Sequence, residues 1–289
     1  MGVGLGAFLI LGTLCVADSA EPSALAPGMD FSSLSSSAQA ALATVLSDGF
    51  CPCGCPHTVG ACLRTHPQCH HAKRMATFAA VMAETGTSGT EIANALSSYY
   101  LSFRDPRISL TVDERMCRGS KTAKVTLVEF FDFECPFCGK ARPMMEKLVA
   151  SKPQLRFCAV PFPLPQHPHA IPAGKVALLA RDKNKYFAVY DALFENQTHL
   201  SVELITSLAV KAGLTAAQVN AALGSDAYQK ELEGKRDAAK TAGVNSTPAL
   251  FFNGHKVELP VTPETLSLMF DDELEWQTHG NAWAPDQAH

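Results

Sequence analysis

Apolar positions are most concentrated in residues 125–131, and this run predicts a buried strand. A helical pattern follows over 139–150, and a second apolar run over 155–160 predicts the next strand. A shorter run at 108–112 predicts a first strand ahead of both. Strands and helices that alternate in this way are typical of an α/β fold.

The pattern after residue 170 is helical for more than seventy positions. Helices are predicted at 173–181, 186–194, 202–212, 216–223 and 226–242. Asn253-Gly254 is a two-residue hairpin signal, and it separates predicted strands at 249–252 and 255–259. A last helix is predicted over 262–275. The order predicts a sheet covered by helices, with further helices inserted in the middle.

A second helical region precedes this α/β region. A short helix is predicted at 38–46, and apolar residues recur at helical spacing after Met75 and again after Ile92. Residues 38–104 are therefore predicted to form a small cysteine-rich helical domain. The stretch 21–37 is rich in Ser, Pro and Ala and is predicted to be a flexible linker, and residues 277–289 a loose tail.

The first twenty residues have the pattern of a secretory signal peptide. Residues 3–16 are small and apolar, too short to span a bilayer comfortably, and small residues follow where cleavage could occur. The pattern departs from the usual one because no Lys or Arg occurs before Arg64. An uncleaved apolar anchor is the alternative.

Composition supports a folded protein with its own core. Of 289 residues, 47% are hydrophobic and 18% charged, and the net charge is −4. There is no basic run, so no nucleic-acid partner is expected. Ten cysteines are present, five of them between Cys51 and Cys69. This usage favours an oxidising compartment or a metal site.

Cys135 and Cys138 are the strongest candidates for chemistry. They lie two residues apart, where the strand 125–131 gives way to a helix. The N-terminus of a helix favours negative charge, lowers a thiol pKa and so produces the nucleophilic thiolate. Cys135 is the predicted nucleophile and Cys138 the thiol that resolves a mixed disulfide. The alternative is a structural zinc pair or a buried disulfide, but the second pair that zinc needs has no match in this region.

Glu129 lies inside the apolar strand, six residues before Cys135. A carboxylate between Val128 and Phe130 is costly unless it has a partner or a task, and burial would raise its pKa towards neutrality. The alternative is that strand alternation places Glu129 on a solvated face.

The segment 128–138, Val-Glu-Phe-Phe-Asp-Phe-Glu-Cys-Pro-Phe-Cys, resembles the active-site segment of DsbA-like thioredoxin-fold proteins. Residues 161–170, 191–197 and 242–254 resemble the segments that follow in the same family. The resemblance covers about 107–270 of the sequence. It implies an α/β thioredoxin-like fold with an inserted helical subdomain over 107–276.

The resemblance also implies roles for individual residues. Pro248 matches the family's cis-proline, and the backbone of Thr247 before it would pair with an extended substrate. Pro136 and Phe137 would tune thiol acidity and contact the substrate. Glu129 would relay protons to the resolving thiol. An ordinary trans turn is the alternative at Pro248, and His167 and His169 are assigned to a surface loop or a substrate rim.

The N-terminal cysteine segment allows three interpretations. Its candidate residues are Cys51, Cys53, Cys55, Cys62, Cys69, His70 and His71. They could form disulfides that staple the helical domain, bind copper or zinc, or form a second redox centre. The segment and the helices after it are similar to the thiol-bearing module of cytochrome c maturation protein H. A Cys117–Cys158 bridge is conceivable, but sequence cannot assign connectivity.

These features predict a periplasmic or otherwise extracytoplasmic thiol–disulfide oxidoreductase that oxidises dithiols. Its partners would be unfolded or cysteine-containing proteins and a membrane or soluble redox partner. The redox-active disulfide Cys135–Cys138 would serve in place of a cofactor, with no metal at that site. The alternatives are a reductase or isomerase in cytochrome or metalloprotein assembly, and a metal-binding chaperone that uses a thioredoxin fold for docking.

Overall fold

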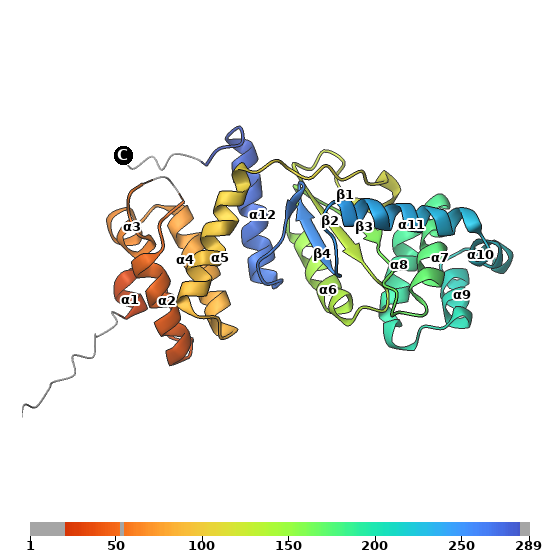
Figure 1. Cartoon of the computed structure of the whole chain (residues 1–289), viewed down its shortest axis with the longest axis horizontal. Helices are drawn as coiled ribbons and strands as arrows, with labels where there is room; N and C mark the ends of the chain where they lie inside the picture. The colour runs from red at the N-terminus through yellow and green to blue at the C-terminus, as the bar shows by residue number, and fades with distance from the viewer. Residues whose placement is uncertain (1–20, 53–54, 284–289) are drawn as a thin grey trace, which may run out of the picture.

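The computed structural model describes residues 21–52 and 55–283, and Figure 1 shows their arrangement. The predicted signal peptide, Cys53 and residues 284–289 lie outside the described residues. Helices α1–α5 gather at the N-terminal end of the molecule, and a sheet with its covering helices forms the rest. None of the described helices is long and apolar enough to cross a bilayer.

The sheet has five strands in the order β1-β3-β2-β4-β5. The strands are β1 (Cys117–Gly119), β2 (Val125–Phe131), β3 (Leu155–Pro161), β4 (Ala249–Phe252) and β5 (His255–Lys256). The central pair β2 and β3 is parallel, and the other pairs are antiparallel. The predicted strands at 125–131, 155–160 and 249–252 are confirmed.

Two strand predictions need correction. Residues 108–112 form no strand, and Ile108 makes one backbone hydrogen bond, from its N–H to the carbonyl of Gly254 at 3.0 Å. Cys117–Gly119 occupies the sheet edge instead, because the chain pairs with β3 there. The returning strand β5 stops at Lys256 rather than continuing to residue 259. Apolar runs alone do not show which of two nearby segments finds a pairing partner.

The helices of the α/β region follow the predicted order. They are α6 (Pro136–Ser151), α7 (Ala170–Asp182), α8 (Tyr186–Glu195), α9 (Val202–Lys211), α10 (Ala216–Leu223), α11 (Asp226–Thr241) and α12 (Pro263–Thr278). Helices α6 and α12 pack on each other and on the sheet. The inserted helices α7–α11 gather at the end of the molecule away from α1–α5 (Figure 1). This is the α/β fold with inserted helices that the sequence predicts.

The N-terminal helices pack into a core of their own. They are α1 (Pro22–Leu25), α2 (Ser36–Asp48), α3 (Val59–Thr65), α4 (His70–Glu84) and α5 (Gly89–Leu101). Leu42, Phe78 and Leu96 are fully buried between them. The predicted linker over 21–37 is wrong, because it contains α1 and buries Phe31 and Leu34 against the helices. The composition of this stretch, rich in Ser, Pro and Ala, gave no sign that its few large apolar side chains would be buried.

Helix α12 joins the two regions. It packs on α4 as well as on the sheet, and it lies between them in Figure 1. The Arg74 guanidinium of α4 pairs with the buried carboxylate of Asp272 at 2.5 Å and also with Glu275. Removing one partner of a buried ion pair typically costs about 3–5 kcal/mol, so these contacts fix α12 against the helical region.

The end of the chain is also packed, so the predicted loose tail from residue 277 is wrong for its described part. Helix α12 continues to Thr278. The Trp283 ring packs on the rings of Phe103 and Trp276, with centroid separations of 4.5 and 5.0 Å. The sequence after residue 277 is mostly polar, and it does not show that the Trp283 ring packs against the N-terminal helical region.

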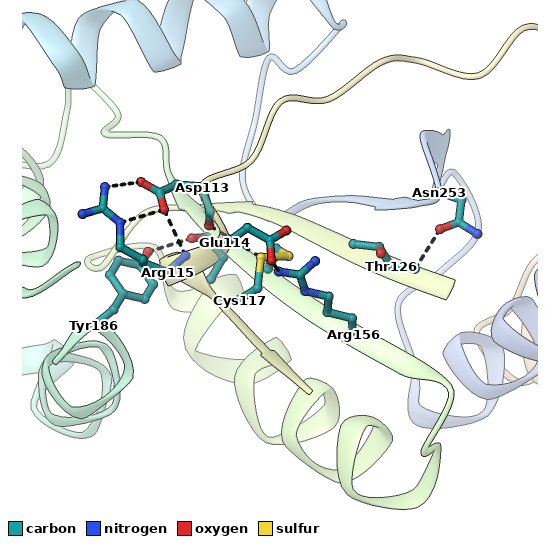
Figure 2. The surroundings of a disulfide bond; sticks show 10 residues. Asp113, Glu114, Arg115, Cys117, Thr126, Arg156, Tyr186 and Asn253 are labelled. Atoms are coloured by element: carbon teal, nitrogen blue, oxygen red, sulfur yellow. Dashed lines mark hydrogen bonds and ion pairs between the residues drawn. A yellow bond between two sulfur atoms is a disulfide. The ribbon is translucent and has the colours of Figure 1, made fainter. Parts of the chain in front are cut away.

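Cys117 and Cys158 form a disulfide between β1 and β3, which Figure 2 shows with its surroundings. The two residues are register partners in the antiparallel ladder, with Cα atoms 4.0 Å apart. The sequence left this pairing open. A bridge that closes 41 residues lowers the entropy of the unfolded chain, which is worth about 4 kcal/mol in the chain-entropy account. It secures the short edge strand β1 to the sheet.

Candidate active site

Cys135 lies at the turn between β2 and α6. The carboxylate of Asp132 accepts a hydrogen bond from the N–H of Glu134 at 2.7 Å and so shapes this turn. Cys135 occupies the position just before α6, and Pro136 is the first helical residue, where its missing N–H leaves no bond unmade. No disulfide joins Cys135 and Cys138 in this structure. The local sequence thus places one thiol at the helix N-terminus and the other one turn along.

The loop before β4 lies against this turn. The Thr247–Pro248 peptide bond is cis, as the family resemblance implies. The Cys135 thiol donates a hydrogen bond to the Thr247 carbonyl at 3.3 Å, although the two residues are 112 positions apart. The structure therefore brings together Cys135, Thr247 and Pro248, which the sequence could relate only by resemblance.

The environments of the two thiols differ. The pKa of Cys135 is lowered to about 5, chiefly by a hydrogen bond from the Cys138 thiol, with help from the Thr247 side chain and from the N–H groups of Phe137 and Cys138. Burial, opposed by no comparable donor, raises the pKa of Cys138 far above its ordinary value. Cys135 keeps 4% of its surface exposed, whereas Cys138 is fully buried. The pair thus has an acidic outer thiol and a basic inner one.

Glu129 is fully buried in β2, so the alternative of a solvated strand face is wrong. Burial raises its pKa to about 8, and the Tyr190 hydroxyl of α8 opposes the rise by donating to one carboxylate oxygen at 3.2 Å. A negative charge on Glu129 in turn raises the pKa of Cys138. The carboxyl and the inner thiol are therefore electrostatically coupled, as the predicted proton relay requires.

Gln197 is a site residue that the sequence did not reveal. Its side-chain amide donates to the carbonyls of Phe133 and Cys135, each at 2.8 Å. It comes from the inserted helical region, just after α8, and so ties that region to the cysteine turn. Gly139 leaves room for it, since a Cβ there would lie 2.1 Å from the amide oxygen. Only the resemblance of residues 191–197 to a DsbA-like segment pointed towards it.

The proline-rich loop after β3 is held against the same turn. The N–H of Leu164 donates to the Asp132 carboxylate at 2.7 Å, and His167 lies 3.0 Å from the same oxygen. The Glu134 carboxylate accepts from the N–H of His169 at 2.6 Å and also lies 3.0 Å from its ring nitrogen. Both histidines therefore brace the cysteine turn.

The predicted substrate contacts differ in accessibility. The Phe137 ring is 66% exposed at the start of α6, beside Cys135. Lys140 lies 5.7 Å from its ring centre. Thr247 is buried. Phe137 and the adjacent exposed Pro136 are thus apolar groups beside the outer thiol that a substrate could cover.

The N-terminal cysteine cluster belongs to the helical region and lies on the other side of α12 from the sheet (Figure 1). The sulfur atoms of Cys51, Cys62 and Cys69 all lie within 4.8 Å of one another. His70 and His71, predicted as possible metal ligands beside them, instead lie 2.7 and 3.1 Å from the Glu275 carboxylate of α12. The predicted cluster is therefore divided into a sulfur group and a histidine–carboxylate group.

This strand–turn–helix with a loop containing a cis-proline opposite it is the arrangement of a DsbA-like thioredoxin fold, and the resemblance is confirmed. Residues 111–272 match the sequence profile of the thioredoxin family. Because that span is more than half of the chain, the protein belongs to this family.

Solved structures share the fold. The thiol-disulfide exchange protein alpha-DsbA2 of Wolbachia pipientis is 21% identical and superposes with a TM-score of 0.50, covering 62% of this chain and 96% of that one. A thioredoxin-like oxidoreductase from Silicibacter pomeroyi DSS-3 is 24% identical, with a TM-score of 0.49, and the match covers 58% and 95% of the two chains.

The curated relatives include larger proteins. The Na(+)/H(+) antiporter NhaA 3 of Salinispora tropica is 29% identical over 164 residues, which cover 56% of this chain and 25% of the relative. The chain therefore spans about a quarter of the length of the curated relatives that it matches.

Titration of the reduced protein tests the lowered pKa of Cys135. The rate of alkylation by iodoacetamide should rise with pH around a midpoint of about 5, because the thiolate is the reactive form. The Cys135→Ser variant should lose this transition. A midpoint near the ordinary value of 9 would contradict the assigned hydrogen bonding.

Replacement of Glu129 by Gln tests its buried carboxyl through stability. The folded chain keeps this proton up to about pH 8, whereas an ordinary Glu loses it near 4.5, so the folded state binds more protons between these values. Wild-type stability therefore falls as pH rises through this window, while Glu129→Gln removes that loss. Relative to wild type, the variant should gain up to about 1.4 kcal/mol per pH unit.

Urea unfolding of both reduced proteins at several pH values across this window would measure the effect. Glu258→Gln is the matched control, since this side chain is 75% exposed, and it should track the wild type. A difference between Glu129→Gln and wild type that does not vary with pH would argue against a neutral buried carboxyl.

Proposed function

We propose that this protein is a thiol–disulfide oxidoreductase that oxidises dithiols in protein substrates through the pair Cys135 and Cys138. One observation carries the proposal: the outer thiol is acidic and the inner thiol is basic. Stabilisation of the Cys135 thiolate favours the reduced form of the pair. A pair whose reduced form is stabilised is a stronger oxidant, as in DsbA.

The reaction begins with Cys135 and Cys138 joined in a disulfide. A substrate thiolate attacks the Cys135 sulfur, forms a mixed disulfide and expels the Cys138 thiolate, which takes up a proton. A second substrate thiolate then attacks the substrate's own sulfur in that bond and expels the Cys135 thiolate. The substrate loses two electrons to the pair. Cys135 is the good final leaving group because its pKa is low.

Glu129 supports the proton step of this cycle. Its carboxyl is neutral near pH 7, since its pKa is about 8, and it is coupled to Cys138. A neutral buried acid can supply the proton that the expelled Cys138 thiolate needs, whereas a carboxylate there would oppose the formation of a second negative charge. Water at the edge of the site would restore the proton to Glu129.

Substrate chains would bind beside Cys135 in an extended form. The Thr247 backbone next to the sulfur offers the pairing edge, and the exposed Phe137 ring offers an apolar contact. Pro136 holds the helix start between them. A redox partner of the same chemical kind, another protein disulfide, would reoxidise the pair.

An extracytoplasmic location agrees with this activity. The Cys117–Cys158 bridge is a structural disulfide in β1 and β3, away from the Cys135–Cys138 pair in sequence and sheet position. Structural disulfides persist in oxidising compartments. The predicted periplasmic setting is therefore part of the proposal.

Oxidation of a reduced two-cysteine peptide, with glutathione disulfide as terminal oxidant, tests the proposal. Cys135→Ser should reduce the rate to the uncatalysed level, and Cys138→Ser should lose the oxidation that depends on the Cys135–Cys138 disulfide, because that disulfide can no longer form. Lys147→Ser, an exposed position on the same helix, should retain full activity. Unchanged oxidation by Cys135→Ser would refute the site, and reduction of insulin without peptide oxidation would indicate the reductase alternative.

A further inference from the structure

Four cysteine side chains converge in the N-terminal region, outside the proposed redox site. They come from different segments: Cys51 and Cys55 from the loop after α2, Cys62 from α3, and Cys69 from the position just before α4. All four are buried, with at most 7% of their surface exposed. Buried sulfur atoms that converge in this way are suited to a closed structural metal site.

The distances between the sulfur atoms suggest shared coordination of an ion. The separation is 3.7 Å between Cys51 and Cys69 and 4.0 Å between Cys55 and Cys62. Zn–S bonds of about 2.3 Å in a tetrahedron place the sulfurs about 3.8 Å apart. The sulfurs of a disulfide are about 2.05 Å apart. The observed separations are close to an edge of a zinc tetrahedron.

A third sulfur atom lies beside those of Cys51 and Cys69. Cys62 lies within 4.8 Å of both Cys51 and Cys69, although those two are already each other's close neighbours. Pairing into disulfides explains contacts two at a time and gives no reason for a third sulfur in the same place. A single ion that binds several thiolates does give one.

The backbone around the cluster is suited to negative sulfur. The N–H of Ala72 in the first turn of α4 donates to the Cys69 sulfur at 3.4 Å, and the N-terminus of this fifteen-residue helix favours the thiolate. The N–H of Cys51 donates a hydrogen bond to the carbonyl of His57 at 3.1 Å, which closes the loop between them. The Phe50–Thr58 bridge closes the same loop.

We propose that Cys51, Cys62 and Cys69 hold a structural Zn²⁺ ion. Cys55, whose sulfur lies 4.0 Å from that of Cys62, is the candidate among the described residues for the fourth position. Thiolates are preferred ligands of zinc, and closed four-ligand sites stabilise small folds. The ion would link the end of α2, helix α3 and the start of α4. His70 and His71 take no part, because both lie against Glu275.

Metal analysis of the full-length protein tests this proposal. The chain is produced in zinc-supplemented medium, purified with a phosphine reductant, and its zinc content is measured by mass spectrometry. About one zinc per chain is expected for a closed site of this kind. Cys62→Ser should lose most of that zinc. His70→Ala, whose side chain is 46% exposed, is the control and should retain it.

A second measurement covers the case in which Cys62→Ser fails to fold. Replacement of zinc by Co²⁺ in the wild-type protein should produce the intense sulfur-to-cobalt absorption of tetrahedral thiolate sites. Absence of zinc, with peptide mapping of protein purified without reductant that finds Cys51 joined to Cys69 and Cys55 to Cys62, would overturn the proposal. Retention of Cu⁺ in preference to zinc would also overturn it. None of these readouts depends on the activity of Cys135.

Discussion

The contact between the Cys135 sulfur and the Thr247 carbonyl holds together the two loops that form the proposed redox site. It joins a turn after β2 to a loop before β4, across an insertion of five helices. β2 and β4 are neighbours in the sheet, so their ladder brings the two loops to the same end. The inserted helices contribute as well, because Gln197 fixes the carbonyls of the cysteine turn. The proposed redox pair is thus held from two sides by segments distant in sequence.

Burial and hydrogen bonding set the pKa values of the groups at this site. Cys138 and Glu129 lie beneath the turn and are both kept from ionising by the absence of solvent. Cys135, at the helix end, has N–H and thiol donors that favour its negative form. A single hydrogen bond between the two thiols therefore lowers one pKa and raises the other. The asymmetry follows from the position of the helix start relative to the core.

Sequence patterns predicted the parts of this structure that depend on local order. The strand 125–131, the cysteine pair and the hairpin at Asn253-Gly254 each carry their signal within a few residues. Contacts that join distant segments left no such signal. Gln197 hydrogen-bonds to carbonyls more than sixty positions away, and Asp132 and Glu134 brace a loop more than thirty positions away. The buried Phe31 and Leu34 were missed because tertiary packing overrides a polar composition.

The central claim is that the fold stabilises the reduced form of the Cys135–Cys138 pair through the Cys135 thiolate. Equilibration with glutathione buffers, read by the fraction of oxidised pair, measures its reduction potential directly. The account predicts a value clearly less reducing than the about −270 mV of thioredoxin and shifted towards the about −120 mV of DsbA. A potential at or below that of thioredoxin would contradict it.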